Sequence, residues 1–156
     1  MPIPPFVAAL RARVGTDPLW LPGVTVVVRD DDGRLLLTQR ADTGQWALVS
    51  GIVDPGEEPA VTAVREAMEE TGVEIRVDRL ASTGAGGEMT YGNGDRAVYL
   101  DLTFACTWLS GEAHVADDES VDVRWWPLDA LPAMSAEVQE RIDSALSDEA
   151  RARFRS

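Results

Sequence analysis

The stretch that decides the fold is Gly51-Ile-Val-Asp-Pro-Gly-Glu-Glu-Pro-Ala-Val-Thr-Ala-Val-Arg-Glu-Ala-Met-Glu-Glu-Thr-Gly-Val73. It predicts a tight glycine loop followed by one helix. Pro55-Gly56 is a turn dipeptide. Pro59 suits the first helical position, where its missing N–H is not needed, and Gly72 suits the position just past the helix end. We therefore expect a helix over residues 59–71.

This helix has two chemically different faces at about 100° per residue. One face is apolar and is expected to pack on the core: Ala60, Val61, Val64, Ala67 and Met68. Glu66, Glu69 and Glu70 gather on the opposite face, because positions i, i+3 and i+4 are neighbours. Carboxylates so close repel each other, and Mg²⁺, which takes carboxylate oxygens, relieves that repulsion. For three glutamates alone, a solvated acidic face is the alternative.

The loop and helix together resemble the Nudix box. That box is Gly, five residues, Glu, seven residues, Arg-Glu, an aliphatic residue, any residue, Glu-Glu, any residue, Gly and an aliphatic residue. The residues that fill the specified positions are Gly51, Glu57, Arg65, Glu66, Ala67, Glu69, Glu70, Gly72 and Val73. The chain is therefore identified as a member of the Nudix hydrolase family, which implies an α/β/α sandwich around a mixed sheet, within the α+β or mixed α/β class.

The resemblance implies roles for the box residues. Glu66, Glu69 and Glu70 would hold Mg²⁺ or Mn²⁺ beside Gly51, and Arg65 with Glu57 would form a structural brace. Two positions depart from the family pattern. Leu48-Val49-Ser50-Gly51 stands where Leu-Pro-Gly-Gly is frequent, and Glu58 stands where a Ser or Thr cap is frequent. The first departure affects the loop at the predicted metal site.

Composition limits the classes of partner. The 156 residues suit one domain, spanning residues 1–156, and the formal net charge is −13 with arginine as the sole basic residue type other than one histidine. Such a balance argues against binding a nucleic-acid polymer through its backbone. The single cysteine, Cys106, excludes an internal disulfide. The sequence shows no apolar stretch near 18 residues and no signal peptide, so we expect no membrane contact and a cytoplasmic location.

The remaining segments predict strands around the box and a helix at each end. Residues 5–14 carry Phe6, Val7, Leu10 and Val14 at helical spacing, an apolar stripe for the chain's own domain or for a second copy in a homodimer. Strands are expected at residues 23–30, 34–40, 46–49, 73–83, 89–91, 96–108 and 121–126, and one or two helices at residues 135–154. On the strand at 96–108, apolar residues alternate with polar ones that would line a cleft, among them Tyr99 and Asp101.

Four residues outside the box are candidates for the site. Arg40 ends a strand at a place where the family often carries an arginine near substrate phosphates, although a surface arginine is the alternative. Trp46 could stack on a base or pack in the core. Tyr91 lies at the spacing associated with dinucleoside polyphosphate hydrolases, or belongs only to the Gly92-Asn93-Gly94-Asp95 hairpin turn. Glu119 best matches a family glutamate that reaches the metal centre, with a solvated acidic loop as the alternative.

The family chemistry is water attack on a nucleoside diphosphate linked to another group, assisted by divalent cations. With no lysine and only His114 as histidine, the base that takes the water's proton is expected to be Glu66, Glu70 or Glu119. ADP-ribose, nucleotide sugars, dinucleoside polyphosphates and nucleoside triphosphates remain open as substrates. The alternative function is a Nudix-fold regulatory or interaction protein that binds a nucleotide without turnover.

Overall fold

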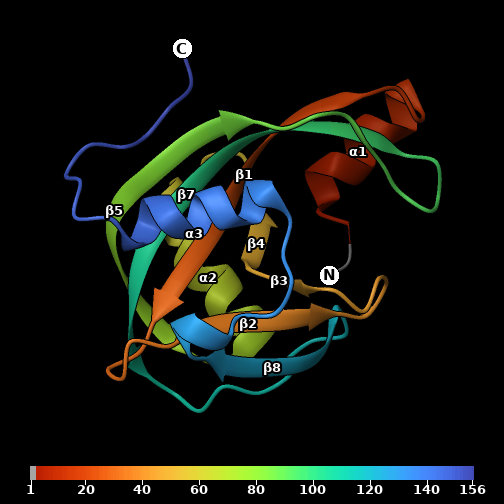
Figure 1. Cartoon of the computed structure of the whole chain (residues 1–156). Coiled ribbons are helices and arrows are strands. Elements are labelled where there is room, and N and C mark those ends of the chain that lie inside the picture. Colours follow the sequence, from red (N-terminus) through yellow and green to blue (C-terminus); the bar gives the residue numbers. More distant parts are fainter. Residues whose placement is uncertain (1–2) are drawn as a thin grey trace.

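The computed structural model describes residues 3–156, in which a mixed sheet is flanked by helices (Figure 1). In chain order the elements are α1 (Pro5–Val14), β1 (Leu19–Arg29), β2 (Leu35–Arg40), β3 (Trp46–Ala47), β4 (Val49–Ile52), α2 (Pro59–Thr71), β5 (Glu74–Ala85), β6 (Met89–Thr90), β7 (Arg96–Ser110), β8 (Ser120–Trp126), the 3-10 helix η1 (Leu128–Ala130) and α3 (Ala136–Leu146). Each predicted strand is present, with shifts at its ends. The strand expected at residues 46–49 continues into the box as β4.

The sheet is mixed because β1 and β7 run parallel. β1 pairs with β7 in parallel from Leu19 opposite Ala97 to Arg29 opposite Thr107. The order along the main path is β3-β2-β1-β7-β5, and β4, β6 and β8 add to β1, β7 and β2. The other pairings between strands β1 to β8 are antiparallel, including β4 on β1, which sets Gly51 opposite Val24. This pairing carries the start of the box into the sheet.

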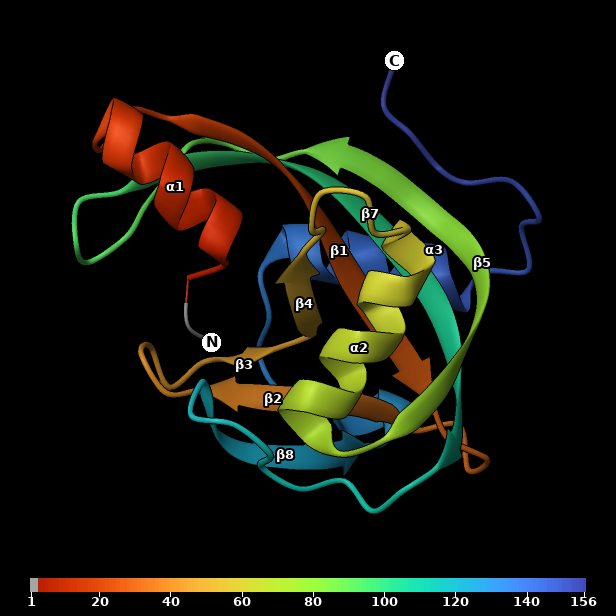
Figure 2. The ribbon, with the colours of Figure 1, turned by 180° about the vertical axis from the view of Figure 1, so that it is seen from behind.

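Alternation along β1 sends side chains to two separate cores, since successive residues of a strand point to opposite faces. Val24, Val26 and Val28 belong to the core under α2, whereas Val27 belongs to the core under α3 with Ile142. Figures 1 and 2, which are opposite views, show α3 in front of the sheet in one and α2 in the other. The expected α/β/α sandwich is confirmed.

The apolar face predicted for α2 is only partly right, because Ala67 is buried and Ala60 packs against the core but the three larger side chains are not buried. Val61, Val64 and Met68 are 55%, 37% and 46% exposed, and the residues that α2 buries are Thr62, Ala63, Glu66, Ala67, Glu70 and Thr71. Two alanines let the helix backbone lie close to the sheet, while the glutamates beside them reach polar partners in the β4 segment and in Arg65. Specific polar contacts therefore override the hydrophobic pattern of this helix.

Of the two terminal helices, α1 spans the predicted residues and α3 is shorter than expected. α3 ends at Leu146 rather than near residue 154. At this end of the helix, Arg79 Nη2 donates hydrogen bonds to the carbonyl oxygens of Ser144, Ala145 and Ser147, which would otherwise lack helical partners. In α1, Val7 is buried and packs with Leu21 and Ala97. Part of the apolar stripe of α1 therefore packs on the chain's own sheet.

Candidate active site

Glycine and proline shape the backbone around α2. Pro59 stands in the first helical turn, and Gly72 takes a left-handed φ of 69° while its N–H donates to Met68 O. Gly56 in the preceding turn has a φ of 86°, which residues with a Cβ rarely adopt. These turns fix how α2 faces β4.

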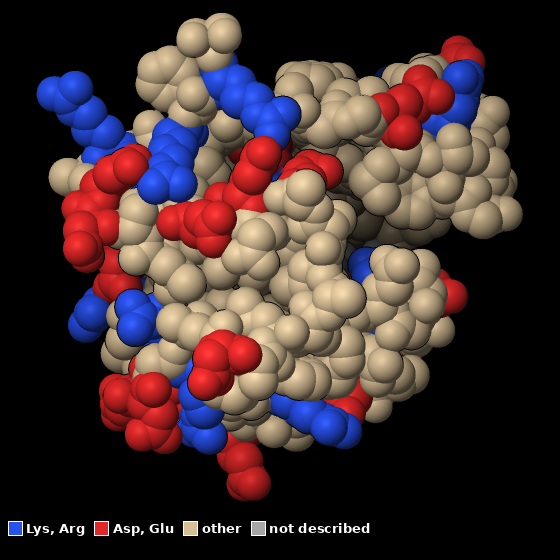
Figure 3. All heavy atoms as spheres, viewed as in Figure 1, with Lys and Arg blue, Asp and Glu red and all other residues tan. Residues whose placement is uncertain are grey.

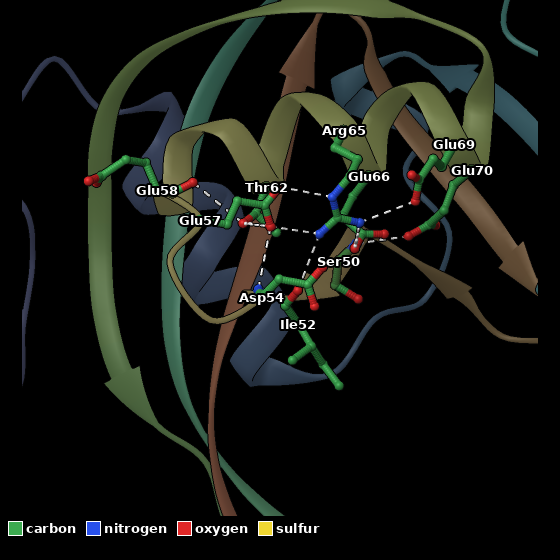
Figure 4. A network of polar contacts seen from close by, with 10 residues as sticks. All are labelled: Ser50, Ile52, Asp54, Glu57, Glu58, Thr62, Arg65, Glu66, Glu69 and Glu70. Carbon is green, nitrogen blue, oxygen red and sulfur yellow. Dashed lines mark hydrogen bonds and ion pairs between the residues drawn. The ribbon is translucent and has the colours of Figure 1, made fainter. Parts of the chain in front are cut away.

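Arg65 is the centre of a network of carboxylates (Figure 4). Its Nε and Nη2 donate to the two oxygens of Glu57, both at 2.9 Å, and Nη1 donates to Glu66 Oε1 at 2.7 Å and to Glu69 Oε2 at 3.2 Å. Glu57 also accepts from Thr62 Oγ1 at 2.8 Å. The guanidinium thereby ties the loop before α2 to the helix itself, the geometry that a structural brace needs.

Glu66 lies directly against Gly51 of β4. A Cβ placed on Gly51 would stand 2.1 Å from Glu66 Cδ, so only glycine fits there. The neighbouring Ser50 donates its backbone N–H to Glu70 Oε1 at 3.4 Å. The Ser50-Gly51 backbone therefore receives the two buried glutamates of α2.

Burial makes these carboxylates weak acids. The pKa of Glu66 is raised to about 7, chiefly by loss of solvent and against the opposing effect of Arg65. The pKa of Glu70 is raised to about 8 by burial first and then by the charges of Glu119 and Glu66. By contrast, the hydrogen bonds from Arg65 lower the pKa of Glu57 to about 2. For Glu66 the loss of solvent outweighs the charge of Arg65, and no arginine is among the causes that shift the pKa of Glu70.

The donor set fits a hard divalent cation. Glu66 Oε2 is buried and has no hydrogen-bond partner within residues 3–156, and a buried carboxylate oxygen without a partner is costly. No group of three or more His, Cys, Asp or Glu side chains in the described residues is gathered at metal-binding distance, because Glu66 and Glu69 share Arg65 instead. Cation binding by Glu66, Glu69 and Glu70 would require Glu69 to move from Arg65, and Glu69 is the half-exposed member of the three.

A cavity of about 740 Å³ opens beside this centre. Its wall includes Ser50 and Gly51 of β4, whereas Glu66, Glu69 and Glu70 are not among the described residues that line it. Two of the box glutamates, Glu66 and Glu70, are instead buried against the backbone of Ser50 and Gly51 in β4. A volume of this size suits a ligand as large as a substituted nucleotide.

Glu119 and Arg40 lie on the cavity wall near Gly51. The backbone N–H of Ala41 donates to Glu119 O at 2.8 Å, which holds the acidic loop against the end of β2. Arg40 is paired with Asp42 at 2.7 Å, and the bond to Asp42 is the main cause that raises the pKa of Arg40. The structure brings both predicted residues to one end of the cavity.

Tyr91 lines the cavity, but Trp46 is not among the described residues of its wall. Tyr91 Oη and Tyr99 Oη are hydrogen-bonded at 2.6 Å. Trp46 packs edge-on against Trp126 with ring centroids 5.1 Å apart, and Arg124 lies over its ring. These contacts agree with packing of Trp46 in the core under α3 rather than with stacking on a base.

Sequence reasoning placed Asp101 of β7 at a cleft but missed the cavity residues of α1 and α3, such as Arg11 and Arg141. Asp101 is buried and accepts from Thr25 Oγ1 at 2.6 Å and Thr103 Oγ1 at 2.8 Å, and Arg141 of α3 lies 3.3 Å from it. The alternation of β7 had indicated that Asp101 faces a cleft. Nothing in the local sequence of α1 or α3 indicated that these helices reach the same cavity.

A model of the NUDIX domain family matches residues 19–146 of the chain. The chain belongs to the Nudix hydrolase family. This Nudix chain is 38% identical over 121 residues to a "MutT-like protein" of Streptomyces ambofaciens, covering 78% of this chain and 73% of that protein. It is 32% identical over 115 residues to the "NAD-capped RNA hydrolase NudC" of Pseudomonas aeruginosa, covering 73% of this chain but 38% of that protein.

Solved structures share the fold. A crystal structure of an ADP-ribose pyrophosphatase from Streptococcus suis aligns with a TM-score of 0.63 at 21% identity, covering 86% of this chain and 98% of that one. The family match and the curated relatives support a Nudix pyrophosphohydrolase, a class that generally uses divalent metal ions. No helix within residues 3–156 has the length and apolar character needed to cross a membrane.

Proposed function

We propose that this Nudix chain is a metal-dependent pyrophosphohydrolase that cleaves the diphosphate of a nucleoside diphosphate linked to another group. The observation that carries the proposal is the buried pair of Glu66 and Glu70 behind Gly51, with Glu66 Oε2 lacking a partner among residues 3–156. Buried carboxylates of this kind are costly unless a cation joins them. The relatives named as a pyrophosphatase and an RNA-cap hydrolase agree with the same reaction type.

In this proposal Glu66, Glu69 and Glu70 hold Mg²⁺ or Mn²⁺ at the backbone of Gly51. The bound cation would neutralise phosphate oxygens and acidify water. Arg65 holds Glu66 and Glu57 in place, and so orients the carboxylates relative to β4. Arg40 supplies a positive charge on the cavity wall for a phosphate oxygen of the substrate.

Glu119 is the proposed acceptor of the proton from the attacking water. It lines the cavity, whereas Glu66 and Glu70 lie behind Ser50 and Gly51. A proton acceptor has to reach the water within hydrogen-bond distance, and the cavity wall provides that position. Asp118 lines the same wall and is the nearest competitor in the sequence.

A panel of ADP-ribose, a nucleotide sugar, a dinucleoside polyphosphate and an oxidised nucleoside triphosphate tests the proposal, with nucleotide products measured in Mg²⁺ and in chelator. We expect Mg²⁺-dependent hydrolysis of at least one compound. Glu70→Gln should lower kcat by two orders of magnitude or more. Glu58→Gln, an exposed glutamate in the same box, is the matched control and should keep wild-type turnover.

Two results would contradict the proposal. Tight nucleotide binding without turnover would favour the alternative of a regulatory or interaction protein. Unchanged turnover in Glu70→Gln would remove that residue from the site. A cytoplasmic location, a single domain over residues 1–156 and the absence of a nucleic-acid polymer as partner remain predictions from the sequence.

A further inference from the structure

The cavity extends well beyond the predicted metal centre. Its wall near Gly51 is polar, whereas the wall formed by α1, the segment before it, the start of β1 and the β6–β7 hairpin carries apolar and aromatic side chains: Ile3, Val7, Leu21, Met89, Tyr91 and Tyr99. Figure 3 shows a hollow between the lobe that carries α1 and the rest of the molecule. A diphosphate fills only part of about 740 Å³, so this second wall faces the remainder of the ligand.

α1 lies outside the part of the chain that the family model matches, since the match begins at residue 19 and α1 ends at Val14. The cavity is therefore completed by a segment that the family core does not include. Ile3, Pro4, Val7 and Arg11 from this segment line it. Figures 1 and 2 both show α1 beside the β6–β7 hairpin, away from α2 and α3.

Two arginines hold α1 to the hairpin. Arg11 Nη2 donates to Arg96 O at 2.5 Å, and Arg11 Nε lies 3.5 Å from a carboxylate oxygen of Asp95. Arg96 Nε donates to Thr16 O at 3.2 Å in return. Val7 adds an apolar contact with Leu21 and Ala97. The wall is thus built by positioned elements, as a binding surface requires.

The charges at this end disfavour a further phosphate. Asp95, Asp101 and Glu137 face Arg11 and Arg141, so carboxylates exceed guanidiniums by three to two. A planar ring with N–H donors fits such a place, because aromatic faces pack on apolar side chains and carboxylates accept from amino groups. Adenine, guanine and cytosine have this chemistry.

We infer that α1 and the β6–β7 hairpin form the binding wall for the base of the nucleotide substrate, so that a segment outside the family core sets the substrate preference. The inference rests on the proposed function for its choice of ligand. It predicts that the affinity for a nucleotide depends on this wall and that the affinity for a bare diphosphate does not.

Isothermal titration with two non-hydrolysed probes in Mg²⁺ tests the inference. The probes are α,β-methylene-ADP and methylenediphosphonate, which share the diphosphate and differ in the nucleoside. The wall variant is Ile3→Ser/Met89→Ser, in which both side chains are half exposed and line the cavity. The control is Leu10→Ser/Leu109→Ser, two partly exposed apolar residues that are not among the described lining residues.

We expect the wall variant to bind α,β-methylene-ADP at least tenfold more weakly and methylenediphosphonate within twofold of the wild type, while the control changes neither. Wild-type binding of the nucleotide probe in the wall variant overturns the inference, as does equal weakening of both probes. A wild type that binds both probes equally overturns it too. Should the substrate panel show no hydrolysis while the binding difference holds, the proposed function fails and the base-binding wall stands.

Discussion

The backbone of Gly51 in β4 and the carboxylate of Glu66 in α2 are in contact, and a Cβ on Gly51 would overlap Glu66 Oε1 at 2.2 Å. The antiparallel pairing of Gly51 with Val24 fixes the strand, and Arg65 Nη1 fixes the other side of the carboxylate at 2.7 Å. Neither partner can move away without breaking one of these contacts. The first glycine of the box is therefore required by the side chain 15 residues later in the sequence.

Gly51→Ala tests this contact. The added methyl group has to displace Glu66, and a misplacement of about 1 Å at a reacting centre costs about 100-fold in rate. We expect kcat to fall by about that factor and the Mg²⁺-induced rise in Tm to shrink. Gly84→Ala in β5, where nothing lies within 4 Å of an added Cβ, is the control and should retain both. Equal activity of the two variants would contradict the role of this contact.

The pH dependence of stability follows from the raised pKa values of Glu66 and Glu70. Without a divalent cation, the native state keeps protons that the unfolded chain has lost above its usual carboxyl pKa of 4.5. The free energy of unfolding therefore falls as the pH rises from about 5 to about 8. Mg²⁺ competes with these protons and binds more tightly at the higher pH. We expect millimolar Mg²⁺ to raise Tm more at pH 8 than at pH 6, as measured by calorimetry.

The control for this measurement is the double variant Glu66→Gln/Glu70→Gln. It has no carboxylate to titrate or to bind the cation at these positions, so both the pH dependence and the Mg²⁺ effect on Tm should largely disappear. A shift as large as that of the wild type would place the cation elsewhere in the protein.

Glu57→Gln tests the brace. Glu57 accepts two hydrogen bonds from Arg65 and one from Thr62, and a hydrogen bond with a charged group contributes about 1.5 to 3 kcal/mol of net stability. We expect the variant to lose about 2 kcal/mol of unfolding free energy at pH 7 in urea denaturation. Because the pKa of Glu57 is lowered to about 2, this contribution is present above pH 4.5 and is lost as the pH falls towards 2.

Glu58→Gln is the neighbouring control, since Glu58 is exposed and its side chain makes no capping hydrogen bond. Its stability should stay within about 0.5 kcal/mol of the wild type, as for most surface substitutions. A loss as large as that of Glu57→Gln would mean that charge alone, and not the contact with Arg65, is responsible.

The box and the positions of the strands along the chain were predictable because both depend on local signals. Turn residues set the ends of α2, and alternation along β7 indicated that Tyr99 and Asp101 face a cleft. The buried face of α2 was not predictable from hydrophobicity, because Val61, Val64 and Met68 are exposed while Glu66 and Glu70 are buried. Their environment is created by β4 and Arg65. A pattern along one helix carries no information about such partners.

The cavity was the least predictable feature, because its wall joins residues distant in the chain. Ile3, Gly51, Tyr91 and Arg141 line one space, although they come from the segment before α1, from β4, from the β6–β7 hairpin and from α3. Whether Trp46 stacks on a base or packs in the core also depends on residues that are distant in the chain. Its contact with Trp126 depends on β3 and β8 pairing with the two edges of β2, which neither sequence segment specifies alone.

Homodimer formation stays a prediction, and the exposed apolar surface of α1 is smaller than the sequence indicated. Val7 packs on the chain's own sheet, whereas Leu10 and Val14 of α1 are 38% and 41% exposed. Exposed apolar side chains on one helix favour a partner surface. Light scattering at micromolar concentration should give twice the chain mass of 16.9 kDa, and Val14→Asp should reduce the measured mass to that of a single chain. A wild-type mass near 16.9 kDa would reject the dimer.

Glu119→Gln tests the proposed proton acceptor. If the carboxylate of Glu119 takes the water's proton, the variant should lose at least 100-fold in kcat and keep its Mg²⁺ affinity, because the glutamates of α2 still hold the cation. The acidic limb of the pH–rate profile should vanish or move, since that limb reports the ionisation of the base. Its charge also raises the pKa of Glu70, so that pKa should fall in the variant.

Asp118→Asn and Asp117→Asn are the matched controls within the same loop. Asp118 lines the cavity beside Glu119, and Asp117 Oδ1 accepts from the backbone N–H of Glu119 at 3.0 Å. We expect Asp118→Asn to change kcat by no more than a few-fold, and Asp117→Asn to act only through the placement of Glu119. A loss of Mg²⁺ affinity in Glu119→Gln would instead make Glu119 a ligand of the cation. An unchanged rate in Glu119→Gln would return the role of base to Glu66 or Glu70, which would then have to reach the water past the backbone of Gly51.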